Sequence, residues 1–273
     1  MSPVGRIAAW MRRQRGERKR RRIVRRMAGP RLLSAFARAY DEVFFIEIGA
    51  NDGEQHDHLR PHVRSPGWSG VMVEPVPYVF ERLRRKYGRL ARVELVNAAI
   101  AERDGPVPFH YLPPVDDPEA EGLPEWYDAI GSFSRESVLA HPELPADAGD
   151  RLVTSEVRGI TFESLCREQR VSSLDLLAID TEGNDAAILN QIDFSARRPR
   201  LVIYEHFHMD AGERRGCREL LRDAGYETME EGLDTFCLLP RPGERLTRTW
   251  RKLRPAVPGT SAEEEWAKAG AAG

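Results

Sequence analysis

The sequence predicts a doubly wound α/β fold, in which helices cover both faces of a mostly parallel sheet. Short apolar runs alternate with segments of helical periodicity across residues 39–240. Two runs, 43–48 and 70–73, end at a carboxylate: Glu47 lies near the end of the first, and Glu74 follows the second. The first run continues into a glycine-bounded loop. Such sheets bind their ligands at the carboxyl ends of the strands, so we expect a binding site there.

The first half of this domain contains predicted strands with helices before and between them. Leu32, Leu33, Phe36 and Tyr40 have helical spacing and precede the first strand. The helix that follows the second strand has its apolar positions at Tyr78, Phe80, Leu83 and Tyr87. The elements expected after the first helix are strands at 43–48 and 70–73, a helix at 78–87, and strands at 93–100 and 107–112.

The second half continues the alternation and ends in a hairpin. The run 174–179 is continuously apolar, as expected for a strand that is buried on both faces. Thr161 is placed to cap a helix, Asn184 or Asp185 to cap another, and Gly225 to end a third. The closing hairpin predicts one antiparallel strand. The expected strands are 151–160, 174–179, 201–204, 226–230 and 235–239, with helices at 161–168, from 184 or 185, and at 213–224.

Composition changes mark the expected domain boundaries. We predict a basic N-terminal arm at 1–38, a domain at 39–240 with an insertion or lid at 113–150, and a tail at 241–273. The arm has 13 Arg or Lys and one acid, although the whole chain has a net charge of −2. It is either a solvated arm, or it attracts an anionic membrane, a nucleic acid or the acidic body of a second copy.

The overall composition excludes several classes of protein. Charged residues make up 31% of the chain and the mean hydropathy is −0.51, so we expect a soluble, cytoplasmic protein. No apolar run approaches the roughly 18 residues of a membrane span or resembles a signal peptide. The three cysteines are far apart, which argues against a disulfide framework or a zinc site.

The glycine loop predicts a nucleoside site. Its pattern is G-x-x-x-G, formed by Gly49 and Gly53, and not the G-x-G-x-x-G of a dinucleotide site. S-adenosylmethionine, which has a nucleoside but no phosphate, fits such a loop better. Glu74 is placed to accept hydrogen bonds from the ribose hydroxyls. The further expected cofactor residues are Glu47, Asn51, Asp52, Asn97, Ala98 and, from the insertion, Ser132; for Asn97 a simple turn role is the alternative.

Polar residues at two later strand ends predict the acceptor site. Asp180, Glu205 and His206 could bind Mg²⁺ or a similar hard cation, which would lower the pKa of an acceptor hydroxyl. Glu182 would then take the proton. In a metal-free alternative, His206 or Glu182 is the base. A third alternative gives Asp180 and Glu182 only a role in the turn and packs His206 against Tyr204 or His208.

Other histidines are interpreted more simply. His56, His58 and His62 follow the glycine loop at the start of a helix, and we expect them on the surface of that loop and helix. His110 and His141 are isolated in the sequence, which favours a structural or exposed position.

Together these motifs resemble the FkbM family of S-adenosylmethionine-dependent methyltransferases, over about residues 43–239. The resemblance implies a class I methyltransferase fold, with a Rossmann-like, mostly parallel seven-stranded sheet, and O-methylation of sugars, polyketides or other metabolites. More distantly similar magnesium-dependent O-methyltransferases have metal-binding acids at the positions of Asp180, Glu205 and His206. The matching segments are Glu47-Ile48-Gly49-Ala50-Asn51-Asp52-Gly53, where the family commonly begins with Asp, and Val73-Glu74-Pro75, Ile179-Asp180-Thr181-Glu182-Gly183 and Ile203-Tyr204-Glu205-His206.

The leading hypothesis is therefore an O-methyltransferase of a carbohydrate or other small metabolite. A nucleic-acid methyltransferase is a second hypothesis, prompted by the basic arm. The acidic remainder of the chain argues against it, so we do not expect a nucleic-acid partner. A nicotinamide oxidoreductase would need the missing G-x-G-x-x-G loop. A non-catalytic nucleoside-binding protein would not need the acids at 180, 182 and 205.

Overall fold

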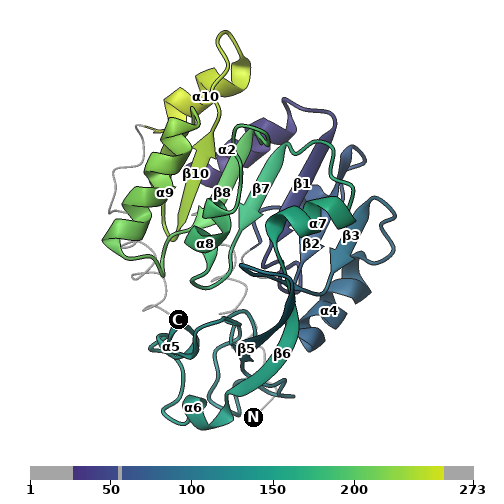
Figure 1. Cartoon of the computed structure of the whole chain (residues 1–273), viewed down its shortest axis with the longest axis vertical. Helices are drawn as coiled ribbons and strands as arrows, with labels where there is room; N and C mark the ends of the chain where they lie inside the picture. Colours follow the sequence, from purple (N-terminus) through teal and green to yellow (C-terminus); the bar gives the residue numbers. More distant parts are fainter. Residues whose placement is uncertain (1–26, 55–56, 255–273) are drawn as a thin grey trace, which may run out of the picture.

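A computed structural model describes residues 27–54 and 57–254 of the chain. Within this part, seven strands form the main sheet in the order β3-β2-β1-β7-β8-β10-β9 (Figure 1). Every neighbouring pair from β3 to β8 is parallel, and β10 runs antiparallel to both of its neighbours. The strands are β1 (Val43–Ile48), β2 (Trp68–Val73), β3 (Val93–Val96), β7 (Leu176–Ile179), β8 (Leu201–Glu205), β9 (Glu227–Glu231) and β10 (Asp234–Leu238).

This topology confirms the predicted doubly wound sheet with one antiparallel strand. The strand register is what positions the site. Ile48, the last residue of β1, pairs with Val73 of β2 on one side and with Ile179 of β7 on the other. The three strands therefore end at the same level, and the loops that follow them open onto one edge of the sheet.

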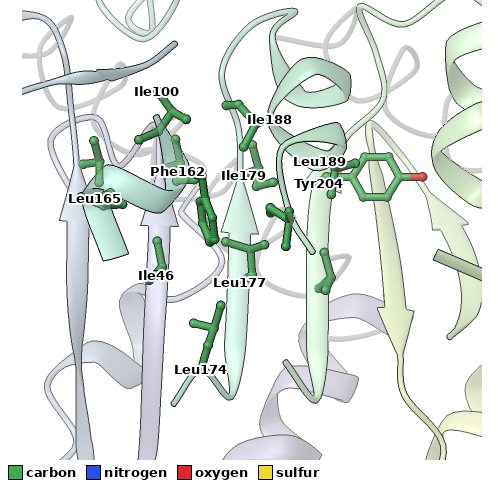
Figure 2. Close-up of a cluster of buried hydrophobic side chains, with 14 of the residues drawn as sticks. Ile46, Ile100, Phe162, Leu165, Leu174, Leu177, Ile179, Ile188, Leu189 and Tyr204 are labelled. Carbon is green, nitrogen blue, oxygen red and sulfur yellow. The ribbon is translucent and has the colours of Figure 1, made fainter. Parts of the chain in front are cut away.

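Helices α7 (Phe162–Glu168), α8 (Asp185–Asn190) and α9 (Ala211–Asp223) cover one face of the sheet. Figure 2 shows part of this core, where Phe162 and Ile188 pack over Ile46, Leu177 and Ile179. Thr161 caps α7 as predicted, because its hydroxyl accepts the backbone N–H of Ser164. The side chain of Asn184 makes no cap bond at α8, and Asp185 instead bonds the preceding turn.

The opposite face is covered by α2 (Ala28–Ala37), α3 (Arg60–Val63), α4 (Pro77–Tyr87) and α10 (Arg245–Leu253). Two of these helices correct the expected domain boundaries, because α2 lies inside the predicted arm and α10 inside the predicted tail. The side chain of Trp250 is fully buried, and the carboxylate of Glu231 accepts the backbone N–H groups of Ala28 and Gly29 at 2.7 Å each. The densest basic part of the arm and the end of the tail lie outside the described residues.

The predicted strand at 93–100 divides between two sheets. β3 stays in the main sheet, whereas β4 (Ala99–Ile100) joins a second sheet with β5 (Gly105–Tyr111) and β6 (Val153–Ile160), in the order β4-β6-β5. The chain turns at Asn97, whose amide donates to the carbonyl oxygens of Glu74 and Pro75 at 2.8 and 3.0 Å. These bonds hold the turn against the end of β2.

The insertion predicted at 113–150 connects β5 to β6. It contains the short helices α5 (Arg135–Leu139) and α6 (Ala148–Arg151), and its own small core around Tyr127 and Val138. In Figure 1, these elements form a lobe with β5 and β6 below the main sheet. No helix of the described chain is both long and apolar enough to cross a membrane.

Candidate active site

A cavity lies where the ends of β1, β2 and β7 face the insertion. The space between its walls is about 480 Å³ and is partly open to solvent. It includes five of the residues predicted for the cofactor and the acceptor. The lining residues are Ile48, Gly49, Glu74, Pro75, Val76, Ala98, Ala99, Ile100, Phe109, Asp128, Ala129, Gly131, Phe133, Asp180, Thr181, Glu182 and Asn184.

Gly49 begins the loop that forms one wall. Its φ is +81°, and a Cβ at this position would lie 1.6 Å from the carbonyl oxygen of Asp180. Only glycine lets the β1 loop pass this close to the end of β7. Gly53 also has a positive φ, of +74°, and its carbonyl accepts the hydroxyl of Tyr87 at 2.8 Å. The two predicted glycines therefore shape the loop, and Gly49 reaches the cavity.

Glu74 lies at the end of β2 with its carboxylate held in place. One oxygen accepts the backbone N–H of Asn51 at 3.0 Å and the other accepts that of Val76 at 2.8 Å. Burial raises the pKa of Glu74 to about 7; these two bonds oppose the rise, while the charges of Asp128 and Asp52 add to it. A carboxylate offers about four acceptor positions, so two remain for a ligand.

The other predicted cofactor residues take different positions. Ala98 is buried and lines the cavity, whereas Asn97 is exposed and uses its amide in the turn described above. The turn alternative therefore describes Asn97 better than an adenine contact does. Asp52 lies behind the loop, where its carboxylate accepts from Lys86 at 2.7 Å.

Glu47 does not line the cavity either. Adjacent residues of a strand point to opposite faces, so Glu47 is directed away from the face of Ile48. Burial, followed by the charge of Asp57, raises the pKa of Glu47. The expected role of Glu47 in binding the cofactor stays a prediction.

Ser132 ties the insertion to the main sheet and does not face the cavity. Its hydroxyl donates to the carbonyl of Glu182 at 2.8 Å and accepts the N–H of Ser134 at 3.3 Å. The neighbouring Phe133 and the buried Asp128 line the cavity. Asp128 pairs with Arg82, and its other oxygen has no hydrogen-bond partner among the described residues. Asp128 was not predicted, because the insertion has no periodic pattern that would mark it.

Acidic side chains gather at the other end of the cavity. One carboxylate oxygen each of Asp180, Glu182 and Glu205 lies within 4.8 Å of the other two. The side chain of Asp180 is exposed, yet desolvation by the surrounding protein atoms, followed by the charges of Glu182 and Asp185, raises its pKa. The pKa of Glu205 is likewise raised, first by burial and then by the charge of Asp180. The sequence correctly placed these three acids at one edge.

His206 was expected in this group but is not among the side chains that gather here, and its metal and base roles stay predictions. Its buried ring is directed to Thr235, with Nδ1 2.8 Å from the hydroxyl oxygen. The reason is the alternation of side chains along an extended chain: Glu205 points to the acidic end, and His206 therefore points to the other face.

Two histidines that the sequence did not assign to the site contact Glu182 instead. His208 Nε2 lies 2.8 Å from Glu182 Oε2, and His141 Nε2 lies 3.5 Å from the same oxygen. Burial alone would raise the pKa of Glu182, but its interactions with His141 and His208 hold it below the usual range. His141 is not the isolated residue that its sequence position suggested, because the insertion folds back onto the edge of the sheet.

The histidines after the glycine loop are more enclosed than expected. His58 Nε2 lies 2.8 Å from the carboxylate of Asp234, and the ring of His62 stacks on Trp68 with centroids 5.2 Å apart. These contacts give both residues a structural role. His56 lies outside the described residues.

Comparison with known proteins agrees with this geometry. The model of the methyltransferase FkbM domain matches residues 47–228, which is more than half of the chain. A 2-O-methyltransferase, NoeI of Sinorhizobium fredii, is 29% identical over 164 residues, which cover 59% of this chain and 62% of that protein. The chain thus spans under two thirds of the length of this relative.

Two solved structures are more distantly similar. A methyltransferase FkbM from Methylobacillus flagellatus has 12% identity and a TM-score of 0.44, over 72% of this chain and 44% of that one. A fibrillarin from Aeropyrum pernix, in complex with S-adenosyl-L-methionine, has 12% identity and a TM-score of 0.39, over 72% and 66% of the two chains. From the domain match and the sheet described above, we conclude that the chain belongs to the FkbM methyltransferase family and has the class I methyltransferase fold.

Proposed function

We propose that this protein transfers the methyl group of S-adenosylmethionine to a hydroxyl of a carbohydrate or another small metabolite. One observation carries the proposal: the same cavity is lined by Gly49 and Glu74, which suit a nucleoside, and by the carboxylates Asp180 and Glu182. A cofactor held by the first pair and an acceptor held by the second would meet inside that cavity.

The cofactor end supports a nucleoside. The free acceptor positions of Glu74 suit the two ribose hydroxyls, which are donors at adjacent carbons. The buried, apolar surfaces of Val76 and Ala98 suit a flat base, and Phe133 closes the same region from the insertion. The N–H groups of residues 49–54 are all bonded within the protein, so it is the carbonyl groups of this loop that suit the ammonium of the methionine part.

The acceptor end supports transfer to oxygen. The acceptor hydroxyl must lose its proton as its oxygen attacks the methyl carbon, while the carbon–sulfur bond breaks and S-adenosylhomocysteine leaves. Asp180 and Glu182 line the cavity and can take that proton. That the similar NoeI is named a 2-O-methyltransferase is further support for oxygen as the accepting atom.

The predicted Mg²⁺ set does not fit this geometry. Two of its members, Asp180 and Glu205, lie together, but the ring of His206 is directed to Thr235. We therefore derive no step through Mg²⁺ bound by those three residues.

Methyl transfer from cofactor with a deuterated methyl group tests the proposal. The protein would be incubated with a panel of sugars, glycosides and hydroxylated metabolites, and the products would be analysed by mass spectrometry and NMR. We expect a labelled methyl group on an oxygen atom of at least one class of acceptor. Labelling confined to nitrogen, or to a nucleic acid included in the panel, would refute O-methylation of small molecules.

A further inference from the structure

Two histidines and a glutamate meet beside the acidic end of the cavity. His141 Nε2, Glu182 Oε2 and His208 Nε2 all lie within 4.8 Å of one another. His208 Nε2 is 2.8 Å and His141 Nε2 is 3.5 Å from the same Glu182 oxygen. Both imidazoles thus present the same ring atom to one carboxylate oxygen, so that three donor atoms converge on one place.

The three residues come from three separate segments, and the fold holds each of them there. His141 follows α5 in the insertion, Glu182 follows β7, and His208 follows β8. Glu182 has a φ of +52°, in the left-handed region that residues other than glycine rarely adopt. Such a backbone conformation persists only where the surrounding structure imposes it. Its carbonyl accepts the hydroxyl of Ser132, a bond that joins the insertion to this turn.

Two buried atoms in this group lack partners. His141 Nε2 and Glu205 Oε2 are both buried, and neither has a hydrogen-bond partner among the described residues. Glu205 is only 8% exposed, and its carboxylate lies within 4.8 Å of that of Glu182. Buried polar atoms are normally satisfied, so both atoms point to a group that is bound at this place.

We propose that His141, Glu182 and His208 bind a divalent transition-metal ion such as Zn²⁺. Two imidazole nitrogens with one carboxylate oxygen suit zinc, iron or nickel, whereas Mg²⁺ prefers oxygen alone. Ligand atoms about 2.0–2.1 Å from a tetrahedral zinc are about 3.3 Å apart. The observed separations of 2.8 and 3.5 Å from Glu182 to the two histidines lie on either side of this value.

The charges around the group favour a cation. A carboxylate oxygen of Asp180 and one of Glu205 each lie within 4.8 Å of a carboxylate oxygen of Glu182. A divalent ion on Glu182 would offset their repulsion. The alternative is a metal-free arrangement, in which the two imidazoles donate hydrogen bonds to an ionised Glu182.

The position of the ion would matter for the reaction. Glu182 lines the cavity, and three protein ligands leave one position of a tetrahedral site open. An acceptor hydroxyl could fill that position and become more acidic, with Asp180 left to take its proton. This role rests on the proposed function, but the binding of the ion does not.

The test is a titration of the full chain, first stripped of metal, with Zn²⁺ and separately with Mg²⁺, followed by calorimetry and by elemental analysis after dialysis. We expect one Zn²⁺ per chain, undisturbed by excess Mg²⁺. His141→Ala and His208→Ala should each weaken binding at least about tenfold, the smallest loss seen when even an outer-shell partner of a ligand is removed. His110→Ala is the matched control, because His110 lies on β5, bonds Thr154 of β6 and should leave Zn²⁺ binding unchanged.

Circular dichroism and cofactor binding would show that each variant is folded, and His141→Gln and His208→Gln replace any alanine variant that is not. Absence of Zn²⁺ binding by the wild-type chain, or binding that survives both histidine substitutions, would overturn the proposal in favour of the metal-free arrangement. Zn²⁺ binding by a protein that methylates no hydroxyl would instead leave the metal site standing and refute the proposed function.

Discussion

Replacing Glu74 with alanine should weaken the binding of S-adenosylmethionine without unfolding the protein. Glu74 is the residue that we assign to the ribose, and its carboxylate is already fixed by the N–H groups of Asn51 and Val76. Hydrogen bonds to a charged group contribute about 1.5–3 kcal/mol, so the dissociation constant should rise about ten- to 150-fold. Isothermal titration calorimetry measures this directly. Glu94→Ala, an exposed carboxylate on β3, is the matched control.

The pKa of Glu74 gives the same prediction a second form. Burial raises it from 4.5 to about 7, so in the folded protein the carboxyl group takes up a proton as the pH falls through this value. Cofactor affinity should therefore increase as the pH rises through about 7 in the wild-type chain and stay flat in Glu74→Gln. The free energy of unfolding should change in the opposite direction to cofactor affinity. Protonation of Glu74 stabilises the folded chain fully below pH 4.5, and this stabilisation is lost as the pH rises to about 7. Unchanged affinity in a folded Glu74→Ala variant would remove Glu74 from the ribose site.

Further predictions concern the loop, the chemistry and the ends of the domain. Gly49→Ala should abolish cofactor binding in calorimetry, because its Cβ would lie 1.6 Å from the carbonyl oxygen of Asp180. Gly216→Ala is the control: this position on α9 faces open space, so the substitution should raise the free energy of unfolding by about 0.5–1 kcal/mol. Asp180→Asn and Glu182→Gln should each lower methyl transfer by about 10²–10⁴-fold and leave cofactor affinity unchanged; full activity of both would contradict their roles. Deletion of residues 1–26 should preserve a cooperative thermal transition, and deletion of 1–37 should lose it, because that cut removes the buried helix α2. An unchanged transition after the longer deletion would show that α2 is dispensable.

The main sheet could be predicted because its pattern is local. The buried strands are continuous apolar runs bounded by turns. The loop after β1 needs glycine because its backbone takes positive φ values, and its two glycines are visible in the sequence. The same logic placed Glu74, Asp180, Glu182 and Glu205 at the ends of their strands. Parallel strands with aligned ends bring such residues to one edge, whatever lies between them in the chain.

The parts that could not be predicted depend on contacts between distant segments. His141 reaches Glu182 only because the insertion folds back, and no periodic signal marks that fold. His208 reaches it because β8, which His208 follows, lies next to β7 in the sheet. The prediction treated His206 and its neighbour Glu205 as one group, although the chain is extended there and adjacent side chains point to opposite faces.

The ends of the domain also depend on contacts between segments that are distant in the sequence. The tail reads as rich in Arg and Pro, yet α10 buries Leu246, Trp250 and Leu253 against the sheet and α2. These three apolar residues have helical spacing, and they form a buried helix face because α2 packs against them. The sequence of the tail alone does not show that α2 lies there.

A crystal structure of the complex with S-adenosylhomocysteine would test the central claim most directly. That claim is that one cavity places the reacting sulfur beside the carboxylates of Asp180 and Glu182. We expect the ribose hydroxyls on Glu74, the amino-acid part against the loop that begins at Gly49, and the sulfur directed toward Asp180 and Glu182. A complex in which the ribose lies away from Glu74, or in which the sulfur faces away from these two acids, would contradict the account.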